Sequence, residues 1–459
     1  MEKAIRHFDR EADISAVRSA IDGQNKKYRI TTFGCQQNEA DGEKIAGLCL
    51  AMGYLPAEND ADADLIVFNT CAIRARAEEK ALSLLGVAHA SRRGKEETVY
   101  ALLGCMAAEK NTVESIKTSF PYVSFTLEPS ALDQFPSKVL ETLQKKKRSF
   151  VYGEDDGSVC EGIPQDRKDP VRPFVSVMYG CNNFCSYCIV PYVRGRERSR
   201  NSADVLAEIR SAIENGGKEI TLLGQNVNSY HADMTFPQLT DKAAGTAGDF
   251  VLKFMTSHPK DLSDELIAVM AKHRGKIAPV FHLPLQSGSD RILKAMNRTY
   301  TREAYLTLVE KLRAAIPDIA VTTDIIVGFP GETEEDFLDT MDIVARVKYD
   351  NMYPFIYSTR TGTVAAKMEN QIPHEISAER MDRLLALSRT IAEEKAGLTL
   401  GRDYRVLVDS FDGENKTCRG KLPSGLPISF EGTEDLLNTF VFVTVTRTTP
   451  FALFGKIKV

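Results

Sequence analysis

The 459-residue sequence contains no tryptophan, and no run of about 18 uncharged apolar residues occurs anywhere in it. Its first twenty residues, MEKAIRHFDREADISAVRSA, lack the apolar core that characterises secretory signal peptides. We therefore expect a cytoplasmic protein without a membrane segment and without a membrane partner.

An excess of positive charge is also missing. The 58 Lys and Arg residues face 63 Asp and Glu residues, for a formal net charge of -5. This balance excludes diffuse electrostatic capture of nucleic acid but leaves room for a local basic patch. Hydrophobic residues make up 43% of the chain and charged residues 26%, which excludes a disordered, collagenous or small disulfide-stabilised protein.

The hydrophobic pattern divides the chain into several domains. Strand-like and helix-like segments alternate three times from Tyr28, which predicts a parallel α/β domain. Six more strand candidates follow Arg172 within about 220 residues, as in part of a parallel βα barrel. Short β-rich runs after Leu398 indicate a small all-β barrel. We expect an N-terminal extension at 1–27, an α/β domain at 28–148, a linker at 149–171, a partial (β/α)6 barrel at 172–397 and an all-β barrel at 398–459.

The strongest chemical signal is the segment CNNFCSYC, which holds Cys181, Cys185 and Cys188 directly after a predicted strand. Cysteines stay reduced in the cytosol, where such clusters indicate metal binding or catalysis more often than disulfides. A structural zinc site normally has four ligands, and no fourth Cys or His lies nearby. Three thiolates suit a cubane iron–sulfur cluster, which then keeps one iron open for a substrate or cofactor.

A second trio, Cys35, Cys71 and Cys105, is spread along the first domain at spacings of 36 and 34 residues. Each cysteine follows a predicted strand, in ITTFGC, VFNTC and ALLGC. Since the carboxyl ends of parallel strands share one edge of a sheet, the fold brings the three together. Structural cysteines would instead be expected inside strands, so this arrangement predicts a second metal centre.

Polar segments follow the other predicted barrel strands, in LLGQNVNSY, TSHP, HLPLQSGSD, VGFPGETEEDF and YSTRTGT. Together they suit the binding of a polar small molecule, although each alone is compatible with an ordinary turn or helix cap. His282, on an apolar strand, is interpreted as a satisfied core histidine. An arginine run beside the cysteine loop is often only a solvated surface, but here it suits phosphate binding; its members are Arg194, Arg196, Arg198 and Arg200.

These residues resemble a known family. CNNFCSYC resembles the signature of the radical S-adenosylmethionine (SAM) superfamily, whose cluster binds SAM at its open iron. The first cysteine trio, the six-unit barrel and the β-rich tail together resemble the methylthiotransferases, which consist of an auxiliary-cluster domain, a radical SAM domain and a TRAM domain. The chain is most similar to the MiaB type in FGCQQNEADGEK, CIVPYVRGRERSR, ITLLGQNVNSY, SHPKD, LPLQSGSDRILKAMNRTY and DIIVGFPGETEEDF. The segment QQNEADGE and a tail with little excess basic charge depart from the pattern of relatives.

The resemblance implies a function and its cofactors. MiaB-type enzymes add a methylthio group to N(6)-isopentenyladenosine beside the tRNA anticodon, and they use SAM and two [4Fe-4S] clusters. The SAM-coordinating cluster would be held by Cys181, Cys185 and Cys188, and the auxiliary cluster by Cys35, Cys71 and Cys105. SAM contacts would come from Tyr187, Gln225, Ser257, Gln286 and Asp324. Contacts to RNA would come from Arg194, Arg196, Arg198 and Arg200.

The implied partners are the tRNA anticodon stem-loop, a flavodoxin- or ferredoxin-like electron donor and an iron–sulfur or sulfur-supply protein, with the enzyme itself a monomer. Two related activities stay open, on N(6)-threonylcarbamoyladenosine in tRNA and on a ribosomal protein aspartate. The segments GQNVNSY and QQN favour isopentenyladenosine. A non-enzymatic iron–sulfur protein that binds RNA or transfers electrons is a third alternative, although the barrel motifs would have no role in it.

Overall fold

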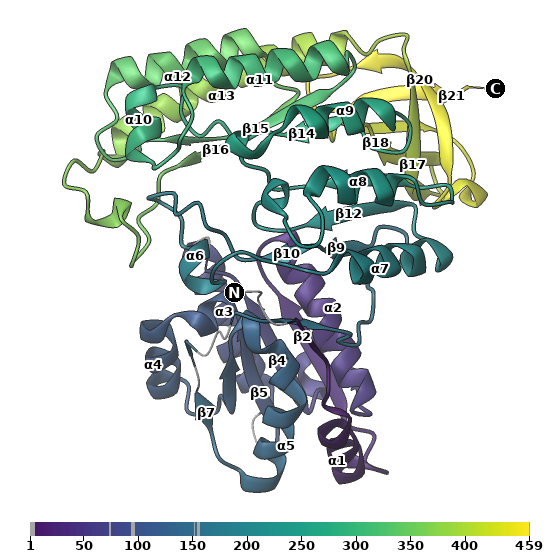
Figure 1. Ribbon diagram of the computed structural model, residues 1–459. Coiled ribbons are helices and arrows are strands. Elements are labelled where there is room, and N and C mark those ends of the chain that lie inside the picture. Colours follow the sequence, from purple (N-terminus) through teal and green to yellow (C-terminus); the bar gives the residue numbers. More distant parts are fainter. Residues whose placement is uncertain (1–4, 73–74, 93–96, 151, 154–156, 459) are drawn as a thin grey trace.

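The computed structural model describes residues 5–72, 75–92, 97–150, 152–153 and 157–458. Residues 1–4 of the expected extension, 151 and 154–156 of the expected linker, and residue 459 of the expected tail barrel lie outside the described residues. An N-terminal α/β unit, a central α/β unit and a small C-terminal barrel follow one another along the chain (Figure 1).

The N-terminal unit is built on a six-stranded parallel sheet with the order β3-β2-β4-β5-β6-β7. Its two central strands, β4 (Leu65–Thr70) and β5 (Val99–Gly104), are buried along their whole length. Their apolar runs LIVF and VYALL have no polar alternation because helices cover both faces of the sheet. The other strands are β2 (Lys27–Thr32), β3 (Leu55–Pro56), β6 (Phe125–Leu127) and β7 (Ser149–Phe150).

Helices pack on both sides of this sheet. One face carries α1 (Glu11–Ile21), α2 (Gln36–Ala51) and α5 (Phe135–Lys145), whose apolar residues share one core. The other carries α3 (Ala75–Ser91), α4 (Lys110–Ser119) and the short helix η2 (Cys105–Ala108). Away from the sheet, β1 (Ile5–His7) pairs in parallel with β8 (Val159–Glu161), so the two ends of this region meet.

The central unit consists of two three-stranded parallel sheets, ordered β13-β12-β9 and β14-β15-β16. Backbone hydrogen bonds link the sheets where Leu252 contacts Lys276 and Ala278. Helices cover the outside, and the arrangement confirms the expected partial (β/α)6 barrel. The strands are β9 (Phe174–Ser176), β12 (Glu219–Leu223), β13 (Val251–Phe254), β14 (Val280–His282), β15 (Ala320–Val327) and β16 (Asn351–Ile356). The helices are α7 (Ser202–Glu214), α8 (Phe236–Ala244), α9 (Asp264–Lys272), α10 (Asp290–Ala295), α11 (Arg302–Ala315), α12 (Glu334–Val347) and α13 (His374–Gly397).

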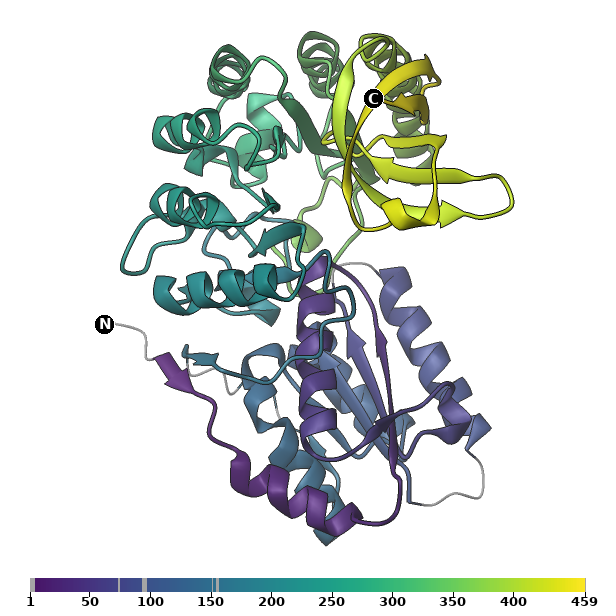
Figure 2. The same ribbon diagram turned by 90° about the vertical axis from the view of Figure 1, so that its right-hand side faces the viewer.

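The C-terminal barrel is closed in the order β17-β18-β19-β21-β20, as the β-rich tail predicts (Figure 2). Two ion pairs, Arg172–Asp409 and Arg405–Asp249, attach it to the central unit. Its strands are β17 (Asp403–Asp412), β18 (Thr417–Lys421), β19 (Pro427–Glu431), β20 (Phe440–Thr448) and β21 (Leu453–Ile457). Among the described residues, none of the helices has the length and apolar character needed to cross a membrane.

Candidate active site

The loop that holds Cys181, Cys185 and Cys188 follows the short strand β10 (Met178–Tyr179) in the central unit. Gly180 precedes the first cysteine with φ +73°, and a Cβ atom there would lie 2.1 Å from the Arg196 carbonyl oxygen. Only glycine fits such a left-handed, crowded position. The local sequence MYGC therefore turns the chain sharply from the strand into the cysteine loop.

The far side of this loop is held by the turn after α10. The Asn297 side-chain amide donates to the carbonyl oxygens of Asn183 and Phe184 at 3.1 and 3.0 Å. The Ser186 hydroxyl donates to the Ala295 carbonyl oxygen at 2.9 Å. Phe184 itself has a φ of 46°, a strained value for a residue with a side chain. The loop is thus kept in one shape by contacts outside itself.

The three thiols of the loop lie close enough to influence one another. Burial raises the pKa of Cys181 to about 11, and burial together with Cys185 raises the pKa of Cys188 to about 12. Uncharged thiols of this kind release their protons when they bind metal, and the resulting thiolates are the ligands of iron–sulfur clusters. Their number, proximity and fixed loop fit a three-thiolate cluster.

Arg298 is a candidate site residue that the sequence motifs did not single out. It is 6% exposed, and its guanidinium donates to the Cys185 sulfur at 3.7 Å, the Tyr187 hydroxyl at 3.2 Å and the Pro284 carbonyl oxygen at 2.8 Å. The available signal was the polar run NRTY directly after the helical segment RILKAM. Arg298 places a permanent positive charge against one cysteine of the loop.

Three of the residues predicted to contact SAM, Ser257, Asp324 and Gln286, are linked by hydrogen bonds and an ion contact at the strand ends, and a fourth contacts the start of the cysteine loop. The Ser257 hydroxyl donates to the His282 carbonyl oxygen, and the His282 ring lies 3.4 Å from the Asp324 carboxylate. The Gln286 amide donates to the Asp324 carbonyl oxygen at 2.9 Å. The fourth, Gln225, accepts from the Gly180 amide next to the cysteine loop. The fifth predicted residue, Tyr187, lies in that loop under Arg298.

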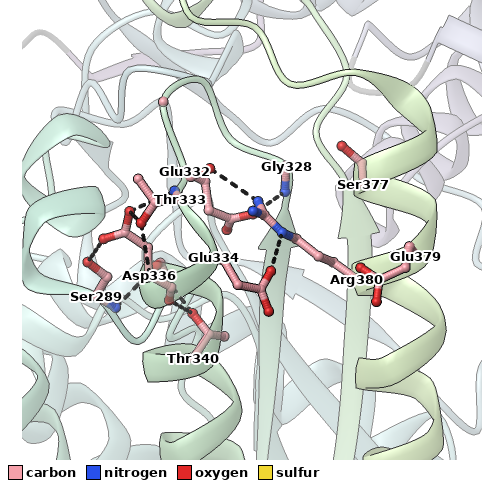
Figure 3. A network of polar contacts seen from close by, with 12 residues as sticks. Ser289, Gly328, Glu332, Thr333, Glu334, Asp336, Thr340, Ser377, Glu379 and Arg380 are labelled. Carbon is pink, nitrogen blue, oxygen red and sulfur yellow. Dashed lines mark hydrogen bonds and ion pairs between the residues drawn. The ribbon is translucent and has the colours of Figure 1, made fainter.

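The segment after β15 uses its polar residues to hold its own shape (Figure 3). The Glu332 carboxylate accepts from the Gly328 amide at 2.8 Å and from Arg380 of α13 at 2.9 Å. Asp336 accepts from the Ser289 hydroxyl at 2.6 Å and from the Thr333 amide at 2.8 Å. In VGFPGETEEDF these carboxylates therefore fix the loop at the barrel edge instead of pointing to a ligand.

The second trio lies at one edge of the N-terminal sheet. The sheet register pairs Thr32 with Asn69 and Thr70 with Gly104, and Cys71 and Cys105 come directly after the second pair. Cys35 lies three residues past Thr32, at the beginning of α2. The parallel register thus aligns the three strand ends as the sequence predicts.

Close contacts between the strand ends bring the second trio together. A Cβ atom on Gly34 would lie 2.7 Å from the Cys71 sulfur, and one on Gly104 would lie 2.4 Å from the Thr70 carbonyl oxygen. Cys105 and Cys35 interact electrostatically, and burial raises the pKa of the Cys105 thiol. Three thiols gathered from three strand ends fit a second cluster. In the part of the chain that the structure describes, no three Cys, His, Asp or Glu side chains converge closely enough to hold a single metal ion. The assignment of an iron–sulfur cluster to this trio therefore rests on the shared sheet edge and on the contacts between the strand ends.

The helical turn α6 (Val190–Val193) lies where the N-terminal and central units meet (Figure 1). It begins two residues after Cys188, and Ile189 and Val193 pack against Ala72 and Cys105. One short segment therefore contacts the auxiliary trio while it continues the chain from the barrel trio. The two candidate cluster sites are therefore connected through this helical turn.

The structure corrects the expectation for three of the four arginines beside the cysteine loop. Arg194, Arg198 and Arg200 are only 5%, 4% and 6% exposed. Arg200 forms ion pairs with Glu161 and Glu208, both at 2.6 Å. Buried guanidiniums satisfied by the protein are not presented to RNA, and an alternating basic run does not reveal this burial. Arg196 alone is exposed, with its guanidinium 4.2 Å above the Phe184 ring.

Three family models match the chain. One for the radical SAM superfamily covers residues 175–344, one for uncharacterized protein family UPF0004 covers 27–128, and one for the TRAM domain covers 397–458. A tRNA-2-methylthio-N(6)-dimethylallyladenosine synthase of Caldicellulosiruptor saccharolyticus is 45% identical over 95% of this chain and 93% of its own length. The same-named protein of Acetivibrio thermocellus is 44% identical over 100% of this chain and 96% of its own. The chain belongs to this synthase family.

The solved structure of the radical SAM methyltransferase TsrM of Kitasatospora setae shares the fold, with a TM-score of 0.55 and 11% identity over 74% of this chain and 75% of that chain. The synthase family is a family of radical SAM enzymes, so SAM and a [4Fe-4S] cluster are its cofactors. The MiaB-type resemblance and the expected fold are therefore confirmed.

Proposed function

We propose that this protein adds a methylthio group to N(6)-isopentenyladenosine next to the anticodon of tRNA. The observation that carries the proposal is the packing of Cys105, from the second trio, against the segment that directly follows Cys188 of the first. Chemistry that joins a radical-generating centre to a sulfur donor needs the two centres close together, and the chain assembles them from two different sheets. Similarity to synthases over nearly the whole chain supports the same substrate class.

In this proposal Cys181, Cys185 and Cys188 hold the SAM-coordinating [4Fe-4S] cluster, and Cys35, Cys71 and Cys105 hold an auxiliary one. The barrel cluster, when bound, supplies the electron and the open iron that reductive SAM cleavage requires. The surrounding residues orient the reactants and exclude water, since the target carbon carries an unactivated C–H bond.

The proposed SAM contacts follow from the strand ends. Gln225 contacts Gly180 beside the cysteine loop, Tyr187 lies within that loop, and Ser257, Asp324 and Gln286 are linked to one another at neighbouring strand ends. Amide, hydroxyl and carboxylate groups suit the amino-acid and ribose portions of SAM. The other ring nitrogen of His282 lies 2.9 Å from the Thr322 hydroxyl, so the ring is held beside the Asp324 carboxylate and positions it.

The target base has to leave its stack to enter the barrel, which an anticodon loop permits at lower cost than a duplex. Arg196, with Phe184 and Tyr192 beside it, offers charge and aromatic surface at the mouth. The C-terminal barrel would hold the remaining stem and loop backbone. We further propose a cytoplasmic monomer that receives electrons from a flavodoxin- or ferredoxin-like protein and sulfur from an iron–sulfur or sulfur-supply protein.

The test combines cofactor content with product analysis. Anaerobically reconstituted protein should hold about eight irons per chain and convert SAM to 5′-deoxyadenosine with dithionite. A strain that lacks the gene should accumulate isopentenyladenosine in its tRNA, and the parent gene should restore the methylthio derivative. Accumulation of the threonylcarbamoyl nucleoside instead would move the assignment to that substrate. Bound iron with no SAM cleavage would support a non-enzymatic protein.

A further inference from the structure

Arg194 is a buried cation at the junction of the two cysteine trios. It follows α6 directly and is 5% exposed. Its guanidinium donates to the Asn38 side-chain oxygen at 2.5 Å and to the Asp41 carboxylate at 2.9 Å. Both acceptors lie on α2, the helix that begins directly after Cys35. A side chain from the central unit thus holds the helix that carries one auxiliary cysteine.

The same segment lies against the auxiliary cysteines. The Asn38 oxygen that accepts from Arg194 lies 3.9 Å from the Cys35 sulfur, and Val193, next to Arg194, packs against Cys105. Although burial opposes the charge, the attraction of both cysteines and Asp41 raises the pKa of Arg194 above its ordinary value. Arginine is charged under all ordinary conditions, so this positive charge is permanent.

The backbone next to Arg194 connects to the barrel trio. The Gly195 carbonyl oxygen accepts from the Cys181 amide at 3.2 Å, and the Arg194 carbonyl oxygen accepts from Arg198 at 3.0 Å. Arg194 donates to α2, and the next residue, Gly195, accepts from the first cysteine of the barrel trio. Two adjacent residues thus connect the two sites.

We propose that Arg194 is a positioning residue that locks the auxiliary trio against the barrel trio and raises the reduction potential of the auxiliary cluster. The inference rests on the proposed function for the presence of that cluster. Hydrogen bonds and positive charge near cluster thiolates stabilise the reduced state, which carries one more negative charge. Asp41 is the opposing group, because it is buried and partly neutralises the guanidinium.

These two charges lead to shifts of opposite sign. Arg194→Gln removes the cation and should move the potential of the auxiliary cluster to a more negative value. Asp41→Asn leaves Arg194 less neutralised and should move it to a more positive value. The Asn side chain can keep a hydrogen bond to Gln37. The Gln37 side-chain nitrogen donates to Asp41 at 3.2 Å, and the buried Gln37 side-chain oxygen, which has no hydrogen-bond partner, can accept from the Asn amide of the variant.

The experiment uses the full chain with Cys181, Cys185 and Cys188 changed to Ala, so that only the auxiliary cluster remains. Iron content is measured first and should be about four per chain. An anaerobic potentiometric titration followed by electron paramagnetic resonance then gives the potential for this background and for Arg194→Gln, Arg194→Lys and Asp41→Asn. Arg194→Lys keeps the charge but loses the forked hydrogen bonds, and its potential should lie between the background and Arg194→Gln.

Arg200→Gln is the matched control. Arg200 is equally buried in the same basic segment but pairs with Glu161 and Glu208, so its loss should leave the potential unchanged. Equal potentials in the background, Arg194→Gln and Asp41→Asn, or an equal shift in Arg200→Gln, would overturn the inference. If Arg194→Gln no longer holds iron, the test rests on Asp41→Asn. A reduction potential in Asp41→Asn that is not more positive than in the background then overturns the inference. A background that binds no iron overturns the auxiliary cluster itself, a result distinct from an unshifted potential.

Discussion

At the residue scale, a buried arginine lies beside each cysteine trio. Arg298 donates to the Cys185 sulfur, and Arg194 donates to the Asn38 oxygen, which lies 3.9 Å from the Cys35 sulfur. A buried guanidinium is costly unless nearly all its hydrogen bonds are made. Thiol, hydroxyl and carbonyl groups accept from Arg298, and a side-chain amide oxygen and a carboxylate accept from Arg194. The hydrogen bonds of both arginines therefore form only when several strand ends are correctly folded, and they fix the arginines beside the cysteine trios.

For Arg298 we expect Arg298→Lys to reduce SAM cleavage about 10- to 100-fold at matched iron content. One ammonium cannot contact Cys185, Tyr187 and the Pro284 carbonyl oxygen together, and the loss of one charge-assisted hydrogen bond costs about 1.5–3 kcal/mol. Chromatography of 5′-deoxyadenosine measures the effect. Arg274→Lys, at an exposed site paired with Asp318, should behave as the parent. A parent-like rate of SAM cleavage in Arg298→Lys would show that the simultaneous contacts of the guanidinium are unimportant.

Asp336 predicts a pH dependence of stability. Burial would raise its pKa, but hydrogen bonds from Arg291, Ser289 and Thr333 outweigh burial and lower the pKa to about 2. Figure 3 shows the contacts from Ser289 and Thr333. An Asp in the unfolded chain has a pKa of about 3.9. The ionised Asp336 carboxylate therefore adds about 2–3 kcal/mol to the free energy of unfolding above that pH, and this contribution is lost as the pH falls toward about 2.

Urea unfolding of Asp336→Asn and the parent should therefore differ by about 2–3 kcal/mol at pH 6 and by about half of that at pH 3. The exposed Asp382→Asn provides the comparison, with a difference near zero at both pH values. A difference for Asp336→Asn that is the same at both pH values would mean that its carboxylate is not held ionised by its partners.

At the scale of elements, the strand ends were predictable from the sequence and their side-chain partners were not. The apolar runs VFNTC and ALLGC define where β4 and β5 end, and the parallel register follows from the alternation with helices. The polar face of α2, with Asn38 and Asp41 buried, is not visible in its sequence because its partner is a residue more than 150 positions away. Local pattern sets the elements, while distant charge pairs become clear only in the tertiary structure.

The turn after β5 provides an element-scale prediction. Gly104 has φ +93°, and a Cβ atom there would lie 2.4 Å from the Thr70 carbonyl oxygen. Gly104→Ala should push β5 away from β4, displace Cys105 from Cys71 and reduce bound iron from about eight to about four per chain. Iron analysis together with electron paramagnetic resonance would show which cluster is lost.

Gly216→Ala separates this effect from backbone strain. Gly216 has a φ of +92°, but an added Cβ atom would meet nothing within 4 Å. It therefore carries the same conformational penalty far from the cysteines and should keep about eight irons. Equal iron loss in both variants would assign the effect to general destabilisation.

At the scale of the whole molecule, the order of the three units was predictable, and so was the gathering of six of the nine cysteines into two trios. The fate of the arginine segment was not. Its alternating charges are typical of a solvated strand, but the N-terminal unit packs against it, so that Arg194, Arg198 and Arg200 are buried where the units meet. Burial of this kind depends on how units pack, which no local pattern records. Only Arg196 remains on the surface for a partner.

That surface supports a prediction for RNA binding. Tyr192 is 49% exposed and its ring lies 5.9 Å from Phe184, which is covered on another side by Arg196. Tyr192→Ala should weaken binding of an isopentenylated anticodon stem-loop by the about 1–3 kcal/mol that stacking of one base contributes.

Arg196→Ala should reduce the slope of log affinity against log salt by about 1, the value for one lost phosphate contact. Fluorescence anisotropy at several salt concentrations measures the affinity and its salt dependence. Arg389→Ala, which changes an exposed arginine of α13, should alter neither. An unchanged slope in Arg196→Ala would place the phosphate contacts elsewhere, with the C-terminal barrel as the next surface to test. A loss of affinity with an unchanged slope in Tyr192→Ala would identify stacking at the mouth of the cysteine loop, because stacking releases no counterions.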